Sequence, residues 1–280
     1  MITRKINGVT FMQFPHLADT VGIKHIVFTR NTGKSRKPFE SLNVSFGVGD
    51  DEQNVLQNRK IVSRCIEGED LIFMDQVHGA RIVVIARDTN PPIPFDSVLS
   101  TESNPTAVLM DPVGGFGSDA EQKLVGDALI TNTPGKFLVV QVADCQSILL
   151  FDPTKQVVSN IHSGWRGSIN NIIGNTVQVM KACFGCIASD IIAGIGPSLG
   201  PCCAEFINYK KEIPEKYWQY KDADNHFDFW SASRDQLCQA GVLLENVHLS
   251  RICTKCNTDQ FFSFRGEGAT GRFATLIGLV

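Results

Sequence analysis

The segment FLVVQVADCQSILLFD, residues 137–152, contains two apolar runs that are separated by a short turn holding Asp144 and Cys145. Apolar runs of this length, bounded by turn residues, are typical of β-strands that are buried in a sheet. The segment therefore predicts a strand, a turn and a second strand. Because the turn carries a thiol, it also places a chemically active side chain at the end of a buried strand.

Runs of the same kind recur along the chain, and helical patterns separate some of them. The runs are IKHIVFTR, DLIFMDQ, RIVVIAR, TAVLM, DALIT, FLVVQVAD, SILLFD, VVSNIH, DIIAGIG, VHLSRIC and ATLIGLV. Apolar residues follow helical spacing near 51–66, 168–184 and 231–245. Strands and helices intermix without a strict β-α-β alternation, which favours the α+β class. No repeat or Pro/Gly/Ser-rich linker divides the chain, so we expect one domain over residues 1–280.

The composition indicates a globular protein with a substantial core, because 43% of the 280 residues are hydrophobic and only 20% are charged. The net charge of −3 and the lack of a long basic block argue against binding to nucleic acid or to an anionic membrane. The segment MITRKINGVTF has no apolar signal-peptide core, and no apolar run is long enough to span a bilayer. We therefore expect a cytoplasmic protein without a nucleic-acid or membrane partner.

Three potential metal ligands, His78, Cys145 and His162, each lie where an apolar run gives way to a turn that contains Gly or Asp. Two imidazoles and one thiolate suit zinc or copper better than magnesium or calcium. Three protein ligands would leave one coordination position open, which is typical of catalytic zinc sites. Each residue also has an ordinary explanation, since a histidine at a turn often bonds to the backbone and a buried cysteine is usually inert. Their convergence in space is the decisive prediction.

The nine cysteines are an odd number spread over a long chain, which favours reduced thiols over a disulfide framework. Two C-x-x-C pairs, Cys183/Cys186 and Cys253/Cys256, could form a zinc ribbon, but they lie much farther apart than ribbon ligands usually do. We favour the alternative interpretation, in which these cysteines are small buried apolar side chains.

Two features are compatible with a site for an anion, although an internal partner for the arginine and steric needs of the glycine-rich loop would explain them equally simply. Arg59 falls on the apolar stripe of the predicted helix 51–66. A buried guanidinium needs a partner, which can be an internal carboxylate or carbonyl group, or an anionic ligand. The loop HSGWRG at 162–167 leads into a helix for which Ser168 is the expected N-cap. Free amides there, with Arg166 beside them, would favour a phosphate or an oxyanion.

Eight short motifs, taken together, resemble a known family. They are SLN at 41–43, QNR at 57–59, QVHG at 76–79, GDALIT at 126–131, ADC at 143–145, HSGWRG at 162–167, IGPSLGPCC at 195–203 and FFSFRGEGATGRFATLIG at 261–278. In this order they resemble the bacterial YfiH/YlmD-type laccase-domain proteins over nearly the whole chain. The resemblance implies a single domain of mixed β-sheets flanked by helices, related to the toxin deamidases, with a deep pocket.

The same resemblance implies zinc held by His78, Cys145 and His162, with copper as the alternative ion. It further implies phosphorolysis of adenosine, inosine and related purine nucleosides by inorganic phosphate, with adenosine deamination as a side activity. An older association of the family with copper-dependent polyphenol oxidation is disfavoured here, because a multicopper oxidase needs more histidines than the six that this chain contains.

Phosphorolysis requires an anion to be held beside the anomeric carbon of the ribose. The candidates for binding phosphate or ribose are Asn43, Arg59, Arg166 and Arg265, together with the backbone amides of residues 164–168. The expected partners are therefore a purine nucleoside and inorganic phosphate, and a monomer is the favoured oligomeric state.

The chain departs from the family pattern near its C-terminal end. Lys255, Phe264 and Gly266 occupy positions that a CTY…FFSYRR tail fills with tyrosine or arginine, which affects the expected substrate preference.

Two other functions stay open. Cys145 could be a nucleophile activated by His162 in a metal-independent hydrolase, although His78 would then have no role. A non-enzymatic module that binds a nucleoside or a protein is the other alternative, against which the polar residues at the strand ends argue.

Overall fold

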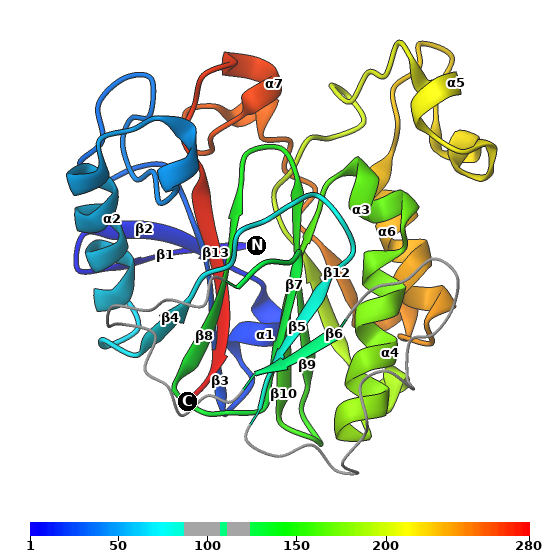
Figure 1. Cartoon of the computed structure of the whole chain (residues 1–280), viewed down its shortest axis with the longest axis horizontal. Coiled ribbons are helices and arrows are strands. Elements are labelled where there is room, and N and C mark those ends of the chain that lie inside the picture. The colour runs from blue at the N-terminus through cyan, green and yellow to red at the C-terminus, as the bar shows by residue number, and fades with distance from the viewer. Residues whose placement is uncertain (87–106, 111–123) are drawn as a thin grey trace.

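The computed structural model describes residues 1–86, 107–110 and 124–280, and its strands form two sheets (Figure 1). The first sheet has six strands in the order β1 (Ile2–Ile6), β2 (Val9–Gln13), β3 (Ile23–Phe28), β13 (Phe273–Leu279), β8 (Lys136–Val142) and β4 (Asp70–Ile72). The second has seven in the order β12 (Val247–Leu249), β11 (Ile192–Ile195), β9 (Gln146–Asp152), β10 (Val157–Ser163), β7 (Ala128–Thr131), β5 (Ile82–Ile85) and β6 (Ala107–Met110). Each sheet contains both parallel and antiparallel pairs.

Seven α-helical segments connect and cover these strands within the described residues. They are α1 (Pro15–Ala18), α2 (Glu52–Arg64), α3 (Trp165–Ile169), α4 (Ile172–Phe184), α5 (Tyr209–Glu212), α6 (Phe229–Gln239) and α7 (Phe264–Glu267). Short 3₁₀ turns occur at η1 (Phe46–Val48), η3 (Ala188–Asp190), η4 (Glu215–Tyr220), η5 (Leu244–Asn246) and η6 (Lys255–Asn257). No helix in the described part of the chain is long and apolar enough to cross a membrane.

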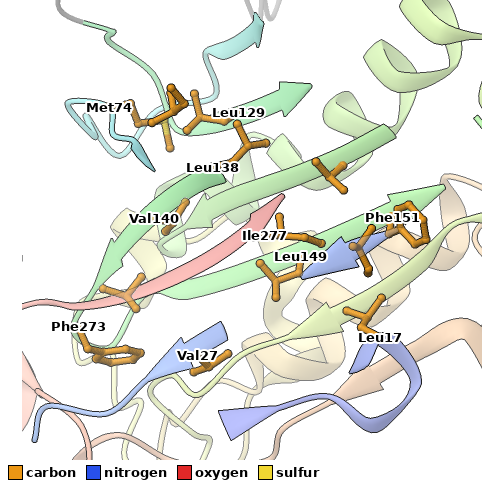
Figure 2. Close-up of a cluster of buried hydrophobic side chains, with 14 of the residues drawn as sticks. Leu17, Val27, Met74, Leu129, Leu138, Val140, Leu149, Phe151, Phe273 and Ile277 are labelled. Carbon is orange, nitrogen blue, oxygen red and sulfur yellow. The ribbon is translucent and has the colours of Figure 1, made fainter. Parts of the chain in front are cut away.

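The two sheets pack face to face, and the longer helices cover their outer faces (Figure 1). α2 lies on the six-stranded sheet, whereas α4 and α6 lie on the seven-stranded one. The apolar cluster between the sheets includes Leu138, Val140 and Ile277 from the first sheet and Leu149 and Phe151 from the second (Figure 2). This layering confirms the predicted α+β class, with mixed sheets flanked by helices.

Strand β8 shows why the strands appear in the sequence as continuous apolar runs. Leu138 and Val140 face the second sheet, while the alternate residues Phe137 and Val139 face α2. Successive side chains of a strand point to opposite faces of the sheet. When both faces are buried, both sets of side chains are apolar, and the sequence does not alternate between polar and apolar residues. Every predicted run contains a strand, although RIVVIAR and TAVLM extend at Arg87 and Thr106 beyond the described residues.

One buried amide joins the two sheets next to the candidate ligand His162. The side-chain nitrogen of Asn160 on β10 donates to the carbonyl oxygens of Leu138 and Thr275, both at 3.0 Å, in the opposite sheet. Its side-chain oxygen accepts from the Ser147 hydroxyl at 2.9 Å. A fully bonded buried amide fixes how the layers stack, because its donors would be costly to leave unpaired.

Two of the predicted helices begin or end at other residues in the structure than the sequence pattern indicated. The helix expected over 168–184 is two helices, α3 and α4, which are separated at Asn171 by a left-handed backbone conformation with φ 54°. Ser168 is therefore not an N-cap, because it lies inside α3, which begins after Gly164. The helix expected over 231–245 begins and ends earlier, since Asp228 caps it and Gly241, with φ 101°, stops the chain from continuing it.

The hairpin β1–β2 is missing from the predicted strands. Its turn, Asn7–Gly8, has positive φ at both residues, 51° and 83°, which is the geometry of a tight two-residue hairpin. β1 is exposed at most of its positions, so its sequence ITRKI lacks a long apolar run. The Asn-Gly dipeptide was the signal that could have identified it.

The two C-x-x-C pairs do not form a ribbon. Cys183, in the last turn of α4, and Cys186, just after it, are buried in an apolar cluster, which agrees with the interpretation as small apolar side chains. Cys253 and Cys256 lie instead beside Cys202 and Cys203, and the structure contains all of them as free thiols. For this second pair the interpretation as buried apolar side chains is wrong, because Cys256 is exposed.

His25, on β3, is a fully buried histidine whose pKa is lowered to about 4, chiefly by burial and to a smaller extent by the charge of Arg4. Its Nε2 accepts the backbone N–H of Phe14 at 2.9 Å, which requires the neutral ring. In the unfolded chain a histidine has a pKa near 6.5, so acid protonates the unfolded state first. Stability is therefore fully present above about pH 6.5 and falls as the pH approaches 4, by about 3 kcal/mol in all.

We expect His25→Gln to remove most of that acid sensitivity. The amide oxygen of glutamine can accept the same backbone N–H, and it does not titrate. Urea titrations give the unfolding free energy at pH 7.5 and at pH 4.5. Between these two pH values the wild type should lose about 2.5 kcal/mol more stability than the variant. His16→Gln, at the exposed His16, is the control. An equally steep loss in the His25 variant would contradict the assignment.

Candidate active site

The structure brings His78, Cys145 and His162 together from three separate segments. His78 lies between β4 and β5, Cys145 lies in the turn between β8 and β9, and His162 lies within β10. Their donor atoms all lie within 4.8 Å of one another. The two imidazole rings meet edge to face, with an interplanar angle of 87°. His162 is buried, Cys145 is half-buried and His78 is exposed, so the group lies at the inner end of an opening.

Unusual backbone conformations allow this approach. His78 and Asp144 have left-handed φ values of 58° and 84°, which are uncommon for residues other than glycine. Gly164 contributes in a different way. A Cβ at this position would lie 3.1 Å from the Cys145 sulfur and 3.3 Å from Cδ2 of His78. A side chain there would require these two residues to shift by a few tenths of an ångström.

A buried carboxylate, Asp127, holds the two histidines in place. Its Oδ1 lies 2.8 Å from Nδ1 of His162 and accepts the backbone N–H of His78 at 2.9 Å. Its Oδ2 accepts the backbone N–H of Gly79 at 2.7 Å. With Nδ1 of His162 bonded to the carboxylate, Nε2 is the nitrogen left to face Cys145. Asp127 was not among the predicted site residues, although it lies in the GDALIT motif.

The charges of the group are coupled. Burial alone would raise the pKa of Cys145, but His162 and His78 outweigh it and lower that pKa to about 6. Burial alone would lower the pKa of His162, but Cys145 and Asp127 raise it to about 9. For Asp127, burial is outweighed by His162 and the two backbone N–H groups, which lower its pKa. The group therefore favours a thiolate, which is the form of cysteine that attacks electrophiles and binds metals.

The donor set fits a borderline or soft metal ion. Two imidazole nitrogens and one thiolate are the ligands that zinc and copper accept, and a carboxylate bonded to the far side of a ligating imidazole is the usual support for such a site. Three donors leave a coordination position free for a substrate group or water, as in catalytic zinc sites.

A cavity of about 710 Å³ opens above the three ligands. Four arginines line it: Arg59, Arg166, Arg265 and Arg272. A cavity of this size accommodates a nucleoside together with a phosphate ion, and the guanidinium groups make it favourable for an anion.

Arg59 reaches the cavity from α2. Its Nε donates to the carbonyl oxygen of Val44 at 2.9 Å, and its guanidinium lies over the rings of Phe73 and Phe46, at 3.7 and 4.4 Å from the centroids. Carbonyl and aromatic partners therefore explain how a guanidinium is tolerated on the apolar stripe of α2.

Arg166 and Arg265 lie nearer to the solvent. The guanidinium of Arg166 stacks over Trp165 at 4.4 Å. Arg265 donates through Nη1 to the carbonyl oxygen of Glu205 at 2.8 Å. Its backbone N–H donates to the Asp144 carboxylate at 2.6 Å, which fixes this arginine beside the Cys145 turn.

Arg272 was missed as a site residue, although it lies in the C-terminal motif that contains Arg265. Its Nη1 donates to the carbonyl oxygens of Thr270 and Gly271 at 3.0 and 2.9 Å. Burial lowers its pKa, while the charges of Cys145 and Asp144 act in the opposite direction. It is thus a half-buried cation in the electrostatic range of the candidate metal ligands.

Asn43 does not reach the cavity. It is fully buried, and its side-chain nitrogen donates to Asp50 and to the carbonyl oxygen of Ser45, at 2.8 and 3.0 Å. Its side-chain oxygen accepts the backbone N–H of Arg272 at 2.8 Å. The structure thus places Asn43 behind the wall, where it positions Arg272.

The structure also shows where the amides of the loop at 164–168 lie, and where the three C-terminal residues that depart from the family pattern lie. The N–H of Ser168 donates to the carbonyl oxygen of Gly164 at 2.9 Å, so this amide is used inside α3. Phe264 is 60% exposed and lines the cavity, so its missing hydroxyl changes the cavity wall directly. Lys255 and Gly266 are exposed neighbours that do not line it.

Comparison with known proteins agrees with the motifs. The family described as "Multi-copper polyphenol oxidoreductase laccase" matches residues 24–280. The chain is 29% identical over 266 residues to the "Purine nucleoside phosphorylase" of Bacteroides thetaiotaomicron, a match that covers 91% of this chain and 90% of that protein. It is 30% identical over 262 residues to the "Purine nucleoside phosphorylase YlmD" of Geobacillus stearothermophilus, covering 89% and 88%.

A solved structure shares the fold. The crystal structure of YlmD from Geobacillus stearothermophilus superposes with a TM-score of 0.78 at 29% identity, and the match covers 99% of this chain and 97% of that one. The predicted resemblance is confirmed: the chain belongs to the multi-copper polyphenol oxidoreductase laccase family, which is the laccase-domain family of YfiH and YlmD.

Proposed function

We propose that this protein is a zinc-dependent purine nucleoside phosphorylase that acts on nucleosides of the adenosine and inosine type, with adenosine deamination as a side activity. The observation that carries the proposal is the His78, Cys145 and His162 group at the inner end of a cavity that four arginines line. The names of the relatives support the same activity.

In phosphorolysis, an oxygen of inorganic phosphate forms a bond to the anomeric carbon of the ribose. The glycosidic bond breaks, and its electron pair leaves with the purine, which takes up a proton. Positive charge develops on the ribose, so the protein must hold the phosphate dianion close to that carbon. The candidates to bind it are the arginines that line the cavity in the described part of the chain, Arg59, Arg166, Arg265 and Arg272, of which Arg272 is added to the predicted set.

His78, Cys145 and His162 would hold the zinc ion, and Asp127 would orient His162 through Nδ1. When bound, the ion would supply a Lewis acid at the inner end of the cavity. Copper is the alternative ion, because the same donors accept it. Oxidation of phenols is disfavoured. Of the two candidate ligand groups among the described residues, only one contains histidine, and multicopper chemistry requires many more imidazole ligands.

One observation favours a second candidate. The pKa of Cys145, lowered to about 6 against the effect of burial by His162 and His78, would suit a nucleophilic thiolate in a metal-independent hydrolase. Such an enzyme needs one histidine beside the sulfur, whereas here both histidines act on it. The second histidine has a clear role only in a metal site, so we rank the zinc enzyme first.

The test is a phosphate-dependent assay. Purified protein is incubated with adenosine or inosine, with and without inorganic phosphate, and the free base is measured by chromatography. We expect adenine or hypoxanthine, with an equal amount of ribose 1-phosphate, only when phosphate is present. Removal of metal by a chelator should stop the reaction, and added zinc should restore it. Base release that does not depend on phosphate and that survives chelation would reject the proposal in favour of the cysteine hydrolase.

A further inference from the structure

A second group of potential metal ligands lies outside the active site. Cys202, Cys203, Cys253 and Cys256 come from two segments that are far apart in the sequence, and their sulfur atoms all lie within 4.8 Å of one another. We propose that these four cysteines bind a structural zinc ion. The proposal does not depend on the reaction that the enzyme catalyses.

The sheet topology explains why the two segments meet. β11 and β12 are parallel neighbours, with Ile195 opposite Leu249. The chain therefore leaves both strands at the same edge of the sheet. The pairing continues beyond the strands, because Ser198 forms a parallel bridge with Cys253 and its N–H donates to the carbonyl oxygen of Ile252 at 3.1 Å. The cysteines follow directly on both segments.

The distances fit a tetrahedral thiolate site. The sulfur of Cys256 lies 3.7 Å from that of Cys202 and 3.6 Å from that of Cys203. Four thiolates at the usual zinc–sulfur distance of about 2.3 Å lie about 3.8 Å apart in a tetrahedron. A disulfide needs about 2.05 Å, and all four cysteines are free thiols. Four sulfurs around one point is the closed ligand set of a structural zinc site.

Two further features suit a cation held by thiolates. The backbone N–H of Gly200 donates to the sulfur of Cys253 at 3.3 Å. A hydrogen bond of this kind stabilises the negative charge of a thiolate that binds a metal. Cys253 is buried while Cys202 and Cys256 are exposed, which places the centre of the group near the surface, where an ion can enter.

The site would fix one wall of the active-site cavity. Leu199, on the first cysteine-bearing segment, lines the cavity and donates its N–H to the carbonyl oxygen of Asp144 at 2.9 Å. The second segment reaches the same residue, since the hydroxyl of Thr254 donates to the Asp144 carboxylate at 2.6 Å. An ion shared by both segments would therefore hold in place the wall next to Cys145.

Metal content separates this site from the first one. The full-length chain is produced with zinc in the medium and purified under reducing conditions without chelator, and zinc per chain is measured by elemental and native mass spectrometry. We expect about two zinc ions in the wild type and about one in a Cys145→Ser/His162→Ala variant. Adding Cys253→Ser and Cys256→Ser should remove the remaining ion. The matched control is Cys183→Ala/Cys186→Ala, which changes the other C-x-x-C pair and should leave the zinc content unchanged.

Cobalt substitution in the Cys145→Ser/His162→Ala variant keeps the test decisive if the cysteine variants fail to fold. Of the ligand groups in the described part of the chain, only the four-cysteine group can then give the strong sulfur-to-metal charge-transfer absorption of a tetrathiolate. One zinc ion in the wild type and none in that variant would overturn the proposal. So would an intact mass two hydrogens lighter than expected, which indicates a disulfide, or iron in place of zinc.

Discussion

His162→Ala is expected to remove the active-site metal and to lower kcat/KM for phosphate-dependent release of adenine by more than about 100-fold. Loss of a residue that only supports a metal ligand already costs about 10- to 100-fold in affinity or activity, and His162 is itself a proposed ligand. The variant also leaves the Asp127 carboxylate without its imidazole partner in a buried position. The variant therefore loses a proposed metal ligand and, at the same site, the partner of a buried carboxylate.

The measurement combines metal content with phosphorolysis of adenosine at saturating phosphate. Since the four-cysteine group holds its own ion in our proposal, the expected change in metal content is a loss of about one zinc ion per chain rather than of all zinc. His226→Ala, at a half-buried histidine that does not line the cavity, should change neither quantity. Full activity in His162→Ala would remove the basis for placing the reaction at this centre.

The positions of the three candidate ligands could be predicted because the signals are local. Each lies at or near the end of an apolar run, and such runs identify strands from a few neighbouring residues. Asp127 carries no comparable signal. It reaches His162 because β10 pairs with β7, with Ile161 opposite Ala128, and this register depends on contacts between segments that are distant in the sequence. The residue before a strand can be seen in the sequence, but its neighbour across the sheet cannot.

The cysteines illustrate the same limit. Spacing of the C-x-x-C kind suggests a metal site, but it does not say which cysteines complete it. The parallel pairing of β11 with β12 decides that Cys253 and Cys256 meet Cys202 and Cys203 rather than the other C-x-x-C pair. Asn43, which was predicted to bind phosphate or ribose, is buried and does not line the cavity, for a related reason. A polar side chain near a motif can point into the cavity or can support the cavity wall from behind, as Asn43 does. Only the fold shows which of the two applies.

Asp127→Asn is expected to weaken metal binding and phosphorolysis by about 10- to 100-fold, which is the usual cost of losing the carboxylate behind a ligating histidine. Within the described residues, the Asp127 carboxylate bonds to nitrogen groups: the N–H groups of His78 and Gly79, and Nδ1 of His162. Asparagine has one acceptor oxygen and one NH₂ group where aspartate has two acceptor oxygens. One of the N–H groups that now bond to Asp127 would therefore face the NH₂ group, which cannot accept its hydrogen bond. Either a backbone N–H loses its acceptor or His162 loses the bond that orients its ring.

The same change should lower the free energy of unfolding by about 1–3 kcal/mol, because a buried donor is left unsatisfied. Asp152→Asn provides the matched control, since Asp152 is also fully buried and its Oδ1 accepts the N–H groups of Thr154 and Lys155, outside the cavity. Zinc titration of the metal-free proteins separates the two effects. A specific role for Asp127 predicts weaker zinc affinity at the active site in Asp127→Asn than in Asp152→Asn, with activity partly restored by excess zinc. Equal zinc affinities in the two variants would show that Asp127 stabilises the fold without positioning His162.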